Sequence, residues 1–120
     1  MNKKYGNFEL RKLYHISGCN APPDLVIEIT ELDNGCFSAK ANYKIFSHNQ
    51  IAPYKHDGCD KDELSAVYSV LNGFDTVLIG ANTNEICWVP VDNPNNICRL
   101  GTGKKVTLDE FKSLKKSSCP

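Results

Sequence analysis

The chain of 120 residues lacks any apolar run that approaches the roughly 20 residues needed to cross a bilayer. Its opening, residues 1–11, carries charge but is not followed by the apolar run that a signal peptide requires. It also has no Asn-x-Ser/Thr acceptor for N-glycosylation. We therefore expect a cytoplasmic protein that does not work at a membrane.

An excess of one charge is also missing. Fourteen Lys and Arg residues balance fourteen Asp and Glu residues, so there is no global positive field to drive non-specific binding to nucleic acid. The charge is segregated along the chain, because residues 57–63 are acidic around Lys61 while residues 104–116 are rich in lysine. We interpret the lysine-rich tail as a solvated helix face and do not expect nucleic acid as the partner.

No Cys-x-x-Cys pair occurs among the six cysteines, which argues against a zinc knuckle or a thioredoxin-like redox site. In a reducing cytoplasm these cysteines are expected to be mostly thiols. If the protein were exported, Cys87 and Cys98 would be the first expected bridge, since a hairpin could bring them together. The sequence leaves open whether any cysteines are bridged.

Alternation of apolar and polar residues predicts a small antiparallel sheet of three to five strands, in a single α+β domain over residues 1–120. Asp33-Asn34-Gly35 separates two of these strands. A three-residue loop there would place Ile29 opposite Ala39 and Gly35 in the left-handed conformation. The predicted strands are 8–16, 25–32, 36–46, 86–91 and 97–100.

One main helix is predicted to pack on a face of this sheet. Asp60 is the expected N-cap, with Glu63 three positions later in a capping box. Whether residues 74–81 continue this helix or form a strand is left open by the pattern. A short C-terminal helix is predicted after Thr107, with Glu110 in a second capping box. The main helix would bury a stripe formed by Leu64, Val67, Tyr68 and Leu71.

Trp88, the only tryptophan, falls in the predicted strand 86–91. Pro90 in the same strand has no N–H donor, which predicts that the strand lies at a sheet edge. A large aromatic side chain in such a strand can anchor the core or a protein interface, and both interpretations stay open.

Candidate chemistry is sparse, and we expect no cofactor. Residues 99–105 lack the first glycine and the magnesium-binding hydroxyl of a phosphate-binding loop. A metal site formed by His56, Asp57, Asp60 and Asp62 is not expected, because Asp60 is needed as a cap and the calcium-loop pattern is absent.

The tetrapeptide His56-Asp57-Gly58-Cys59 contains the residue types needed for thiol catalysis. Nearby carboxylates oppose the thiolate form, and His56 would have to fold back across two residues to act as a base. A thiol-dependent enzyme or redox sensor using Cys59 and His56 is therefore the alternative hypothesis.

Three segments carry a resemblance: Leu25-Val-Ile-Glu-Ile, Ala41-Asn-Tyr-Lys-Ile and Gly58-Cys-Asp-Lys-Asp-Glu-Leu-Ser-Ala-Val. Over residues 8–80 the chain resembles a family of small, functionally uncharacterised bacterial α+β proteins with no assigned catalytic residue or cofactor. This resemblance favours a main helix that reaches about Leu78. In type, the chain is also similar to immunity proteins of bacterial toxin systems, small cytosolic proteins without active sites, many of which carry an acidic patch for a basic nuclease.

The leading hypothesis is a non-enzymatic protein-binding domain, specifically an immunity-like inhibitor that neutralises a bacterial toxin by direct binding. The expected partner is another protein, such as a basic toxin domain. Neither the identity of that partner nor the oligomeric state follows from the sequence. The predicted partner contacts are His56, Asp57, Lys61, Asp62 and Trp88.

Overall fold

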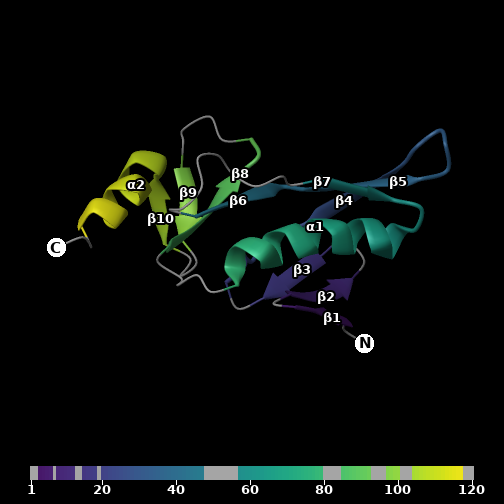
Figure 1. Ribbon diagram of the computed structural model, residues 1–120, viewed down its shortest axis with the longest axis horizontal. Helices are drawn as coiled ribbons and strands as arrows, with labels where there is room; N and C mark the ends of the chain where they lie inside the picture. The colour runs from purple at the N-terminus through teal and green to yellow at the C-terminus, as the bar shows by residue number, and fades with distance from the viewer. Residues whose placement is uncertain are drawn as a thin grey trace.

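The described residues form a mixed α+β architecture with three antiparallel sheets, one main helix and one short C-terminal helix (Figure 1). The α+β prediction with these two helices is confirmed, but the expected sheet of three to five strands was too small. The molecule is elongated, with extents of 52 × 29 × 21 Å. This computed structural model describes residues 3–6, 8–12, 15–18, 20–47, 57–79, 85–92, 97–100 and 104–117.

The first sheet has the order β1-β2-β3, formed by Lys3–Tyr5, Phe8–Lys12 and His15–Gly18. The single strand predicted over residues 8–16 is therefore wrong, because the chain doubles back and Leu10 pairs with Ile16. Both side chains are buried. Paired residues of neighbouring strands face the same side of a sheet, so the apolar spacing of the hairpin resembles that of one longer strand.

The second sheet has the order β4-β5-β7, formed by Ile27–Glu31, Phe37–Ala41 and Asp57–Asp60. Ile29 pairs with Ala39, and Gly35 has a φ of 85°, as the predicted three-residue loop requires. The Gly35 N–H donates to the carbonyl oxygen of Leu32 at 3.0 Å, which closes the turn. The predicted register of this hairpin is confirmed.

Asn42 divides the predicted strand 36–46 into β5 and β6 (Tyr43–Ser47). The Asn42 side chain accepts a hydrogen bond from the Val26 N–H at 2.9 Å and donates one to the Asp24 carbonyl oxygen at 2.8 Å. The Asn42 backbone N–H also donates to the Val26 carbonyl oxygen at 3.1 Å, while its carbonyl oxygen accepts from the Val91 N–H at 3.0 Å, so Asn42 bonds to the β4 side and to the β8 side. The chain consequently leaves the second sheet at Asn42 and enters the third.

The third sheet has the order β10-β9-β8-β6, in which β8, β9 and β10 are Ile86–Pro90, Ile97–Leu100 and Lys105–Thr107. Strand β8 lies between β6 and β9, so the prediction that it is an edge strand is wrong. Pro90 is the last residue of β8, where the missing N–H donor removes at most one bond from the end of the ladder.

Helix α1 runs from Glu63 to Leu78, so residues 74–78 continue the helix. Its N-cap is Asp62, whose side chain accepts a hydrogen bond from the Ser65 N–H at 3.1 Å. The predicted N-cap, Asp60, is instead the last residue of β7 and pairs with Phe37. An N-cap and a strand residue both have extended backbone, so local preference permits either aspartate, and the pairing of β7 with β5 decides between them.

The main core lies between α1 and the strands on either side of it (Figure 1). Gly58 brings β7 close to the helix, since a Cβ atom at this position would lie 2.8 Å from the Ser69 Oγ. On the β1–β2 side, the ring of Tyr5 stacks on that of Tyr68 at 4.8 Å. The fully buried side chains of this core include Val67, Leu71, Phe74, Ile27, Ile45 and Trp88.

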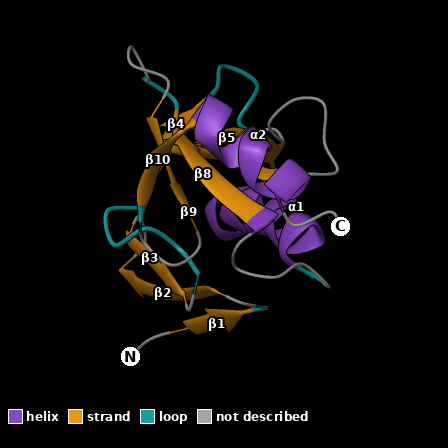
Figure 2. Cartoon of the chain, turned by 90° about the vertical axis from the view of Figure 1, so that its left-hand side faces the viewer, coloured by secondary structure: helices purple, strands orange, loops and turns teal. Residues whose placement is uncertain are grey.

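A second, smaller core lies between the β8–β10 strands and helix α2, which spans Leu108–Ser117. Thr107 caps α2 as predicted, because its Oγ1 accepts a hydrogen bond from the Glu110 N–H at 3.1 Å. Viewed from the α2 end, Figure 2 shows the β1–β3 sheet at the opposite side of the molecule from α2. The second core consists of Phe46, Cys87, Val89, Cys98, Leu100, Val106 and Phe111.

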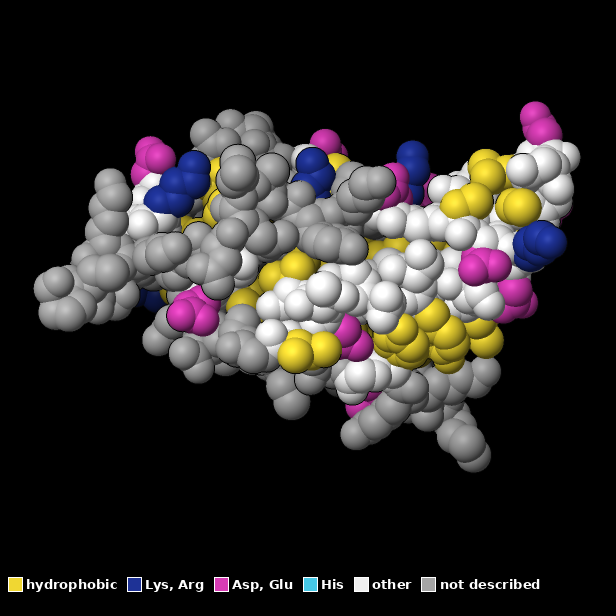
Figure 3. All heavy atoms as spheres, in the orientation of Figure 1, with side chains coloured by type: hydrophobic (Ala, Val, Ile, Leu, Met, Phe, Trp, Pro, Cys, Tyr) yellow, Lys and Arg dark blue, Asp and Glu magenta, His cyan; other side chains and the backbone are white. Residues whose placement is uncertain are grey.

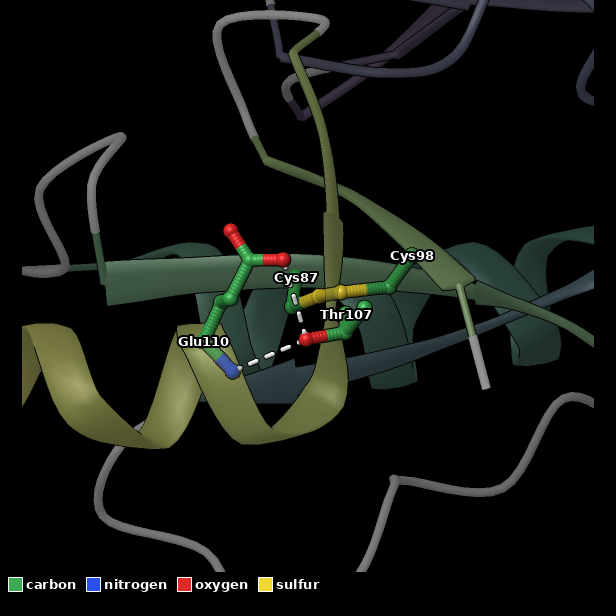
Figure 4. The surroundings of a disulfide bond; sticks show 4 residues. All are labelled: Cys87, Cys98, Thr107 and Glu110. Carbon is green, nitrogen blue, oxygen red and sulfur yellow. Dashed lines mark hydrogen bonds between the residues drawn. A yellow bond between two sulfur atoms is a disulfide. The ribbon is translucent and has the colours of Figure 1, made fainter. Parts of the chain in front are cut away.

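A disulfide joins Cys87 of β8 to Cys98 of β9 within this second core (Figure 4). Both cysteines are fully buried. The expectation of thiols at these two positions is therefore wrong, and the pairing that was expected only for an exported protein is the one present. Cys36 and Cys59 are free thiols.

Candidate functional site

Of the five predicted partner contacts, Asp57, Lys61 and Asp62 lie near the entrance of α1. Asp57 is exposed in β7, and Lys61 and Asp62 are exposed in the short connection between β7 and α1. Asp57 belongs to the face of the sheet turned away from the helix, because its neighbour Gly58 faces α1 and side chains alternate along a strand. His56 lies outside the described residues.

Folding brings further carboxylates to this entrance. The strand register aligns Glu31 of β4, Phe37 of β5 and Asp60 of β7 in one row across the sheet. The hairpin that carries Glu31 and the exposed Asp33 therefore ends beside the start of α1. Figure 3 shows acidic side chains gathered at this end of the molecule. We call this the acidic surface, and it comprises Glu31, Asp33, Asp57, Asp60, Asp62 and Glu63.

Glu31 and Asp33 were not among the predicted contacts, because more than twenty residues separate them from the helix entrance in the sequence. The predicted hairpin placed Glu31 near its tip, but nothing in the pattern showed that β7 would pair beside β5. A prediction that β7 pairs with β5 would have identified Glu31 and Asp33, since this pairing fixes which hairpin residues lie next to Asp60.

Two aspartates on the acidic surface also stabilise local structure. The Asp62 Oδ2 accepts hydrogen bonds from the Ser65 N–H at 3.1 Å and from the Ser65 hydroxyl at 3.3 Å. The Asp60 Oδ1 accepts one from the Lys61 N–H at 2.7 Å. Helix capping thus belongs to Asp62, which the sequence had left for partner binding, and not to Asp60.

Trp88 lies in the main core and not on the surface. Its side chain is fully buried, with its ring 5.1 Å from that of Phe74 and 6.3 Å from that of Phe8. Of the two interpretations left open, the structure places Trp88 as a core anchor. Among the described residues, its Nε1–H has no hydrogen-bond acceptor.

Cys59 is exposed in β7, where it pairs with Ser38 of β5. It belongs to the strand, and the helix begins at Glu63. The structure therefore does not place Cys59 in the first turn of α1, where a helix dipole acts on a thiol. Its proposed catalytic partner, His56, is outside the described residues.

A cleft that the sequence did not predict lies where β4 begins, β5 passes into β6 and β8 ends. It consists of two neighbouring cavities of about 460 and 350 Å³, which share Asp24, Tyr43 and Pro90 in their walls. These volumes are in the lower part of the range typical of small-molecule sites. The residues that line the cleft come from distant parts of the chain, so no local motif marks them.

A polar group lies at the boundary between the two cavities. The Tyr43 hydroxyl donates toward the Asp24 carboxylate, at 2.8 Å from Oδ1 and 3.0 Å from Oδ2. Burial and then the hydrogen bond to Asp24 raise the pKa of Tyr43 to about 12. The phenol therefore stays protonated at neutral pH. On the other side, the Arg99 Nη1 lies 3.8 Å from the Asp24 Oδ1.

The two cavities differ in charge. The larger cavity is lined by Asp24, Glu28 and Asp92 together with a single cation, Lys40. The smaller cavity is lined by Arg99 and Lys105 together with Asp24. Ionised side chains, a phenol donor and partly exposed apolar residues are groups suited to binding a small polar ligand.

A scan against protein-family models gives no match, and searches of curated proteins and of solved structures also find none. In the described part of the chain, no helix is long and apolar enough to cross a bilayer. Among the same residues, no group of three or more His, Cys, Asp or Glu side chains has the arrangement of a metal site.

Proposed function

We propose that this chain is a non-enzymatic protein-binding domain that uses the acidic surface to bind a basic protein. The form of this function that we propose is an immunity-like inhibitor, which neutralises a bacterial toxin by direct binding to a basic toxin domain. The observation that carries the proposal is the convergence of carboxylates from the β4–β5 hairpin, strand β7 and the start of α1.

Electrostatics supports this proposal. The acidic surface contains six carboxylates, with Lys61 among them and Lys40 directly opposite Asp57 on the neighbouring strand. Its local formal charge is therefore −4, on a chain whose overall formal charge is zero. Such a concentration of one sign speeds the association of an oppositely charged protein and discriminates against acidic ones. The effect acts over about 8 Å at physiological ionic strength and weakens as salt is added.

The Cys87–Cys98 disulfide bears on where this function takes place. Disulfides persist in oxidising compartments and are rare in the cytoplasm of most organisms. We therefore propose an oxidising compartment in place of the expected cytoplasmic one. Counting free thiols in the protein as isolated, under denaturing conditions without reductant, tests this: four or fewer thiols among the six cysteines support it, and six contradict it.

The exposed thiol of Cys59 favours a second candidate, a thiol-dependent enzyme or redox sensor that uses Cys59 with His56. The two candidates differ in the reactivity of this thiol. Alkylation of Cys59 at the rate of an ordinary exposed thiol supports the binding protein, while rapid alkylation that depends on His56 supports the enzyme or sensor.

The experiment for the leading proposal measures complex formation with the product of the neighbouring gene, at low and high salt. The test variant is Glu31→Lys/Asp33→Lys, which reverses two charges without touching the helix cap. The matched control is Asp92→Lys/Asp109→Lys, which makes the same charge change at exposed positions elsewhere. We expect association at low salt to slow by roughly 10-fold in the test variant alone, with the difference shrinking at high salt.

Absence of a complex would contradict the proposed partner. Equal effects of the two double variants would contradict the acidic surface as the binding site, since a net-charge effect alone would then suffice.

A further inference from the structure

Arg99 and Lys105 lie directly opposite each other on the neighbouring antiparallel strands β9 and β10. Residues in this position have Cβ atoms about 4.5–5.5 Å apart, so two like charges there repel each other. Both side chains also line the smaller cavity of the cleft. An anion in that cavity would relieve the repulsion and bind to both cations.

Within the described part of the chain, the ion pair of the Arg99 guanidinium is the one with Asp24. The Arg99 side chain is 23% exposed, and the 3.8 Å between its Nη1 and the Asp24 Oδ1 exceeds hydrogen-bonding distance. Both Asp24 oxygens are already within hydrogen-bonding distance of the Tyr43 hydroxyl. A guanidinium carries five N–H donors in a planar fork that fits a carboxylate with two parallel bonds.

The rest of the smaller cavity favours an apolar body on the ligand. Ile97 is 38% exposed at its rim although it is a large apolar residue, and Pro90 forms part of its wall. Apolar contacts beside a few placed polar groups are the usual composition of a small-molecule site.

The larger cavity restricts the ligand to one negative charge. Its carboxylates, Asp24, Glu28 and Asp92, outnumber the single cation Lys40 and give it a formal charge of −2. The smaller cavity has a formal charge of +1, from Arg99 and Lys105 against Asp24, which belongs to the walls of both cavities and is counted in each. A second anionic group that reached past Tyr43 would meet repulsion.

We propose that this cleft binds a small organic monocarboxylate, with its carboxylate between Arg99 and Lys105 and its apolar part against Ile97 and Pro90. The carboxylate position at Arg99 and Lys105 shares no residue with the acidic surface, whereas the larger cavity borders that surface at Lys40, which pairs with Asp57. The proposal goes beyond the proposed protein-binding function. The residues that define it are brought together by the β9–β10 pairing and by the break of the strand at Asn42.

The test uses N-acetyl-leucine as the probe and follows backbone amide shifts of the whole chain by NMR. We expect saturable shifts centred on β9 and β10, with a dissociation constant in the millimolar range that is usual for so small a ligand. The neutral N-acetyl-leucine amide should give no saturable shifts. N-acetyl-glutamate, which carries a second carboxylate, should bind at least several-fold more weakly.

Lys105→Gln is the test variant and Lys104→Gln the matched control, since both residues are exposed and adjacent, and only Lys105 lines the cavity. We expect about a 10-fold increase in the dissociation constant for Lys105→Gln and no change for Lys104→Gln. Lys105→Gln should also melt no lower than the wild type, because it removes a repulsion. Arg99→Gln should abolish binding, and if this variant does not fold, Lys105→Gln still decides the matter.

Three results would overturn the proposal: no saturable shifts with N-acetyl-leucine, equal binding of its neutral amide, or equal effects of the two lysine variants. Equal binding of N-acetyl-glutamate would overturn the restriction to a single negative charge.

Discussion

Removal of the Cys87–Cys98 disulfide should lower the free energy of unfolding by about 3 kcal/mol. The bridge joins residues separated by 11 positions. In the chain-entropy model, a closed loop of that length restricts the unfolded chain by roughly 9 cal/mol/K, which corresponds to about 2.8 kcal/mol at 25 °C. The variant Cys87→Ala/Cys98→Ala also loses two buried sulfur atoms. Its free energy of unfolding should therefore fall by at least this amount.

Urea unfolding followed by the fluorescence of Trp88 provides the measurement, because Trp88 is the only tryptophan and is fully buried. With a urea dependence of about 1–3 kcal/mol/M, the midpoint should fall by roughly 1–3 M. The matched control is Cys59→Ala, which removes an exposed free thiol and should leave the midpoint unchanged. Reduced wild-type protein keeps its two buried sulfur atoms, so its midpoint should fall between those of the oxidised wild type and the double variant.

The structure also predicts which part of the protein is destabilised most when the disulfide is removed. The disulfide lies in the second core, whose few side chains include Phe46 and Phe111 packed edge to face at 5.7 Å. A core of this size leaves little apolar area to replace the lost constraint. Amide exchange in β9 and β10 should therefore accelerate in the double variant at urea concentrations where Trp88 is still buried. A double variant within about 0.5 kcal/mol of the wild type would refute the reasoning, since surface changes alone reach that size.

Two further predictions test the helix cap and the cleft. Asp62→Ala should lower the free energy of unfolding by about 1 kcal/mol in urea and Asp60→Ala by clearly less, because Asp62 caps α1; the reverse order would favour the sequence-based assignment. Tyr43 should titrate near pH 12 by phenolate absorbance, above the 10.0 of an unperturbed tyrosine. Because this pKa is raised by folding, its contribution to stability is fully present below pH 10 and is lost as the pH rises to about 12. The stability difference between the wild type and Tyr43→Phe should shrink over that interval, and a constant difference would contradict the assignment.

The elements that the sequence predicted correctly depend on contacts close in the chain. The register of the β4–β5 hairpin followed from the Asp33-Asn34-Gly35 loop, whose geometry fixes which strand residues face each other. The cap of α2 followed from Thr107 and Glu110, three positions apart. Interactions of this kind are decided within a few residues, so the pattern carries them.

The sequence-based predictions were wrong where pairing with a segment distant in the chain determined the structure. Asp60 satisfies the local pattern of an N-cap, but pairing with Phe37 makes it a strand residue. Strand β8 contains a proline, but β6 and β9 flank it on both sides. Residues 8–16 alternate as one strand would, but they belong to a hairpin.

The candidate sites show the same contrast between features set by residues close in the chain and features set by distant segments. The sequence by itself determined the acidic entrance of α1, because Asp57, Asp60, Asp62 and Glu63 are neighbours in the chain. Only the tertiary structure added Glu31 and Asp33 to that surface, through the pairing of β5 with β7. The cleft depended on folding entirely, because Asp24 and Tyr43 are distant in the chain from each other and from the Arg99–Lys105 pair of the β9–β10 hairpin. Charge at one point of a sequence can be read directly, whereas a cavity exists only once separate segments have packed around it.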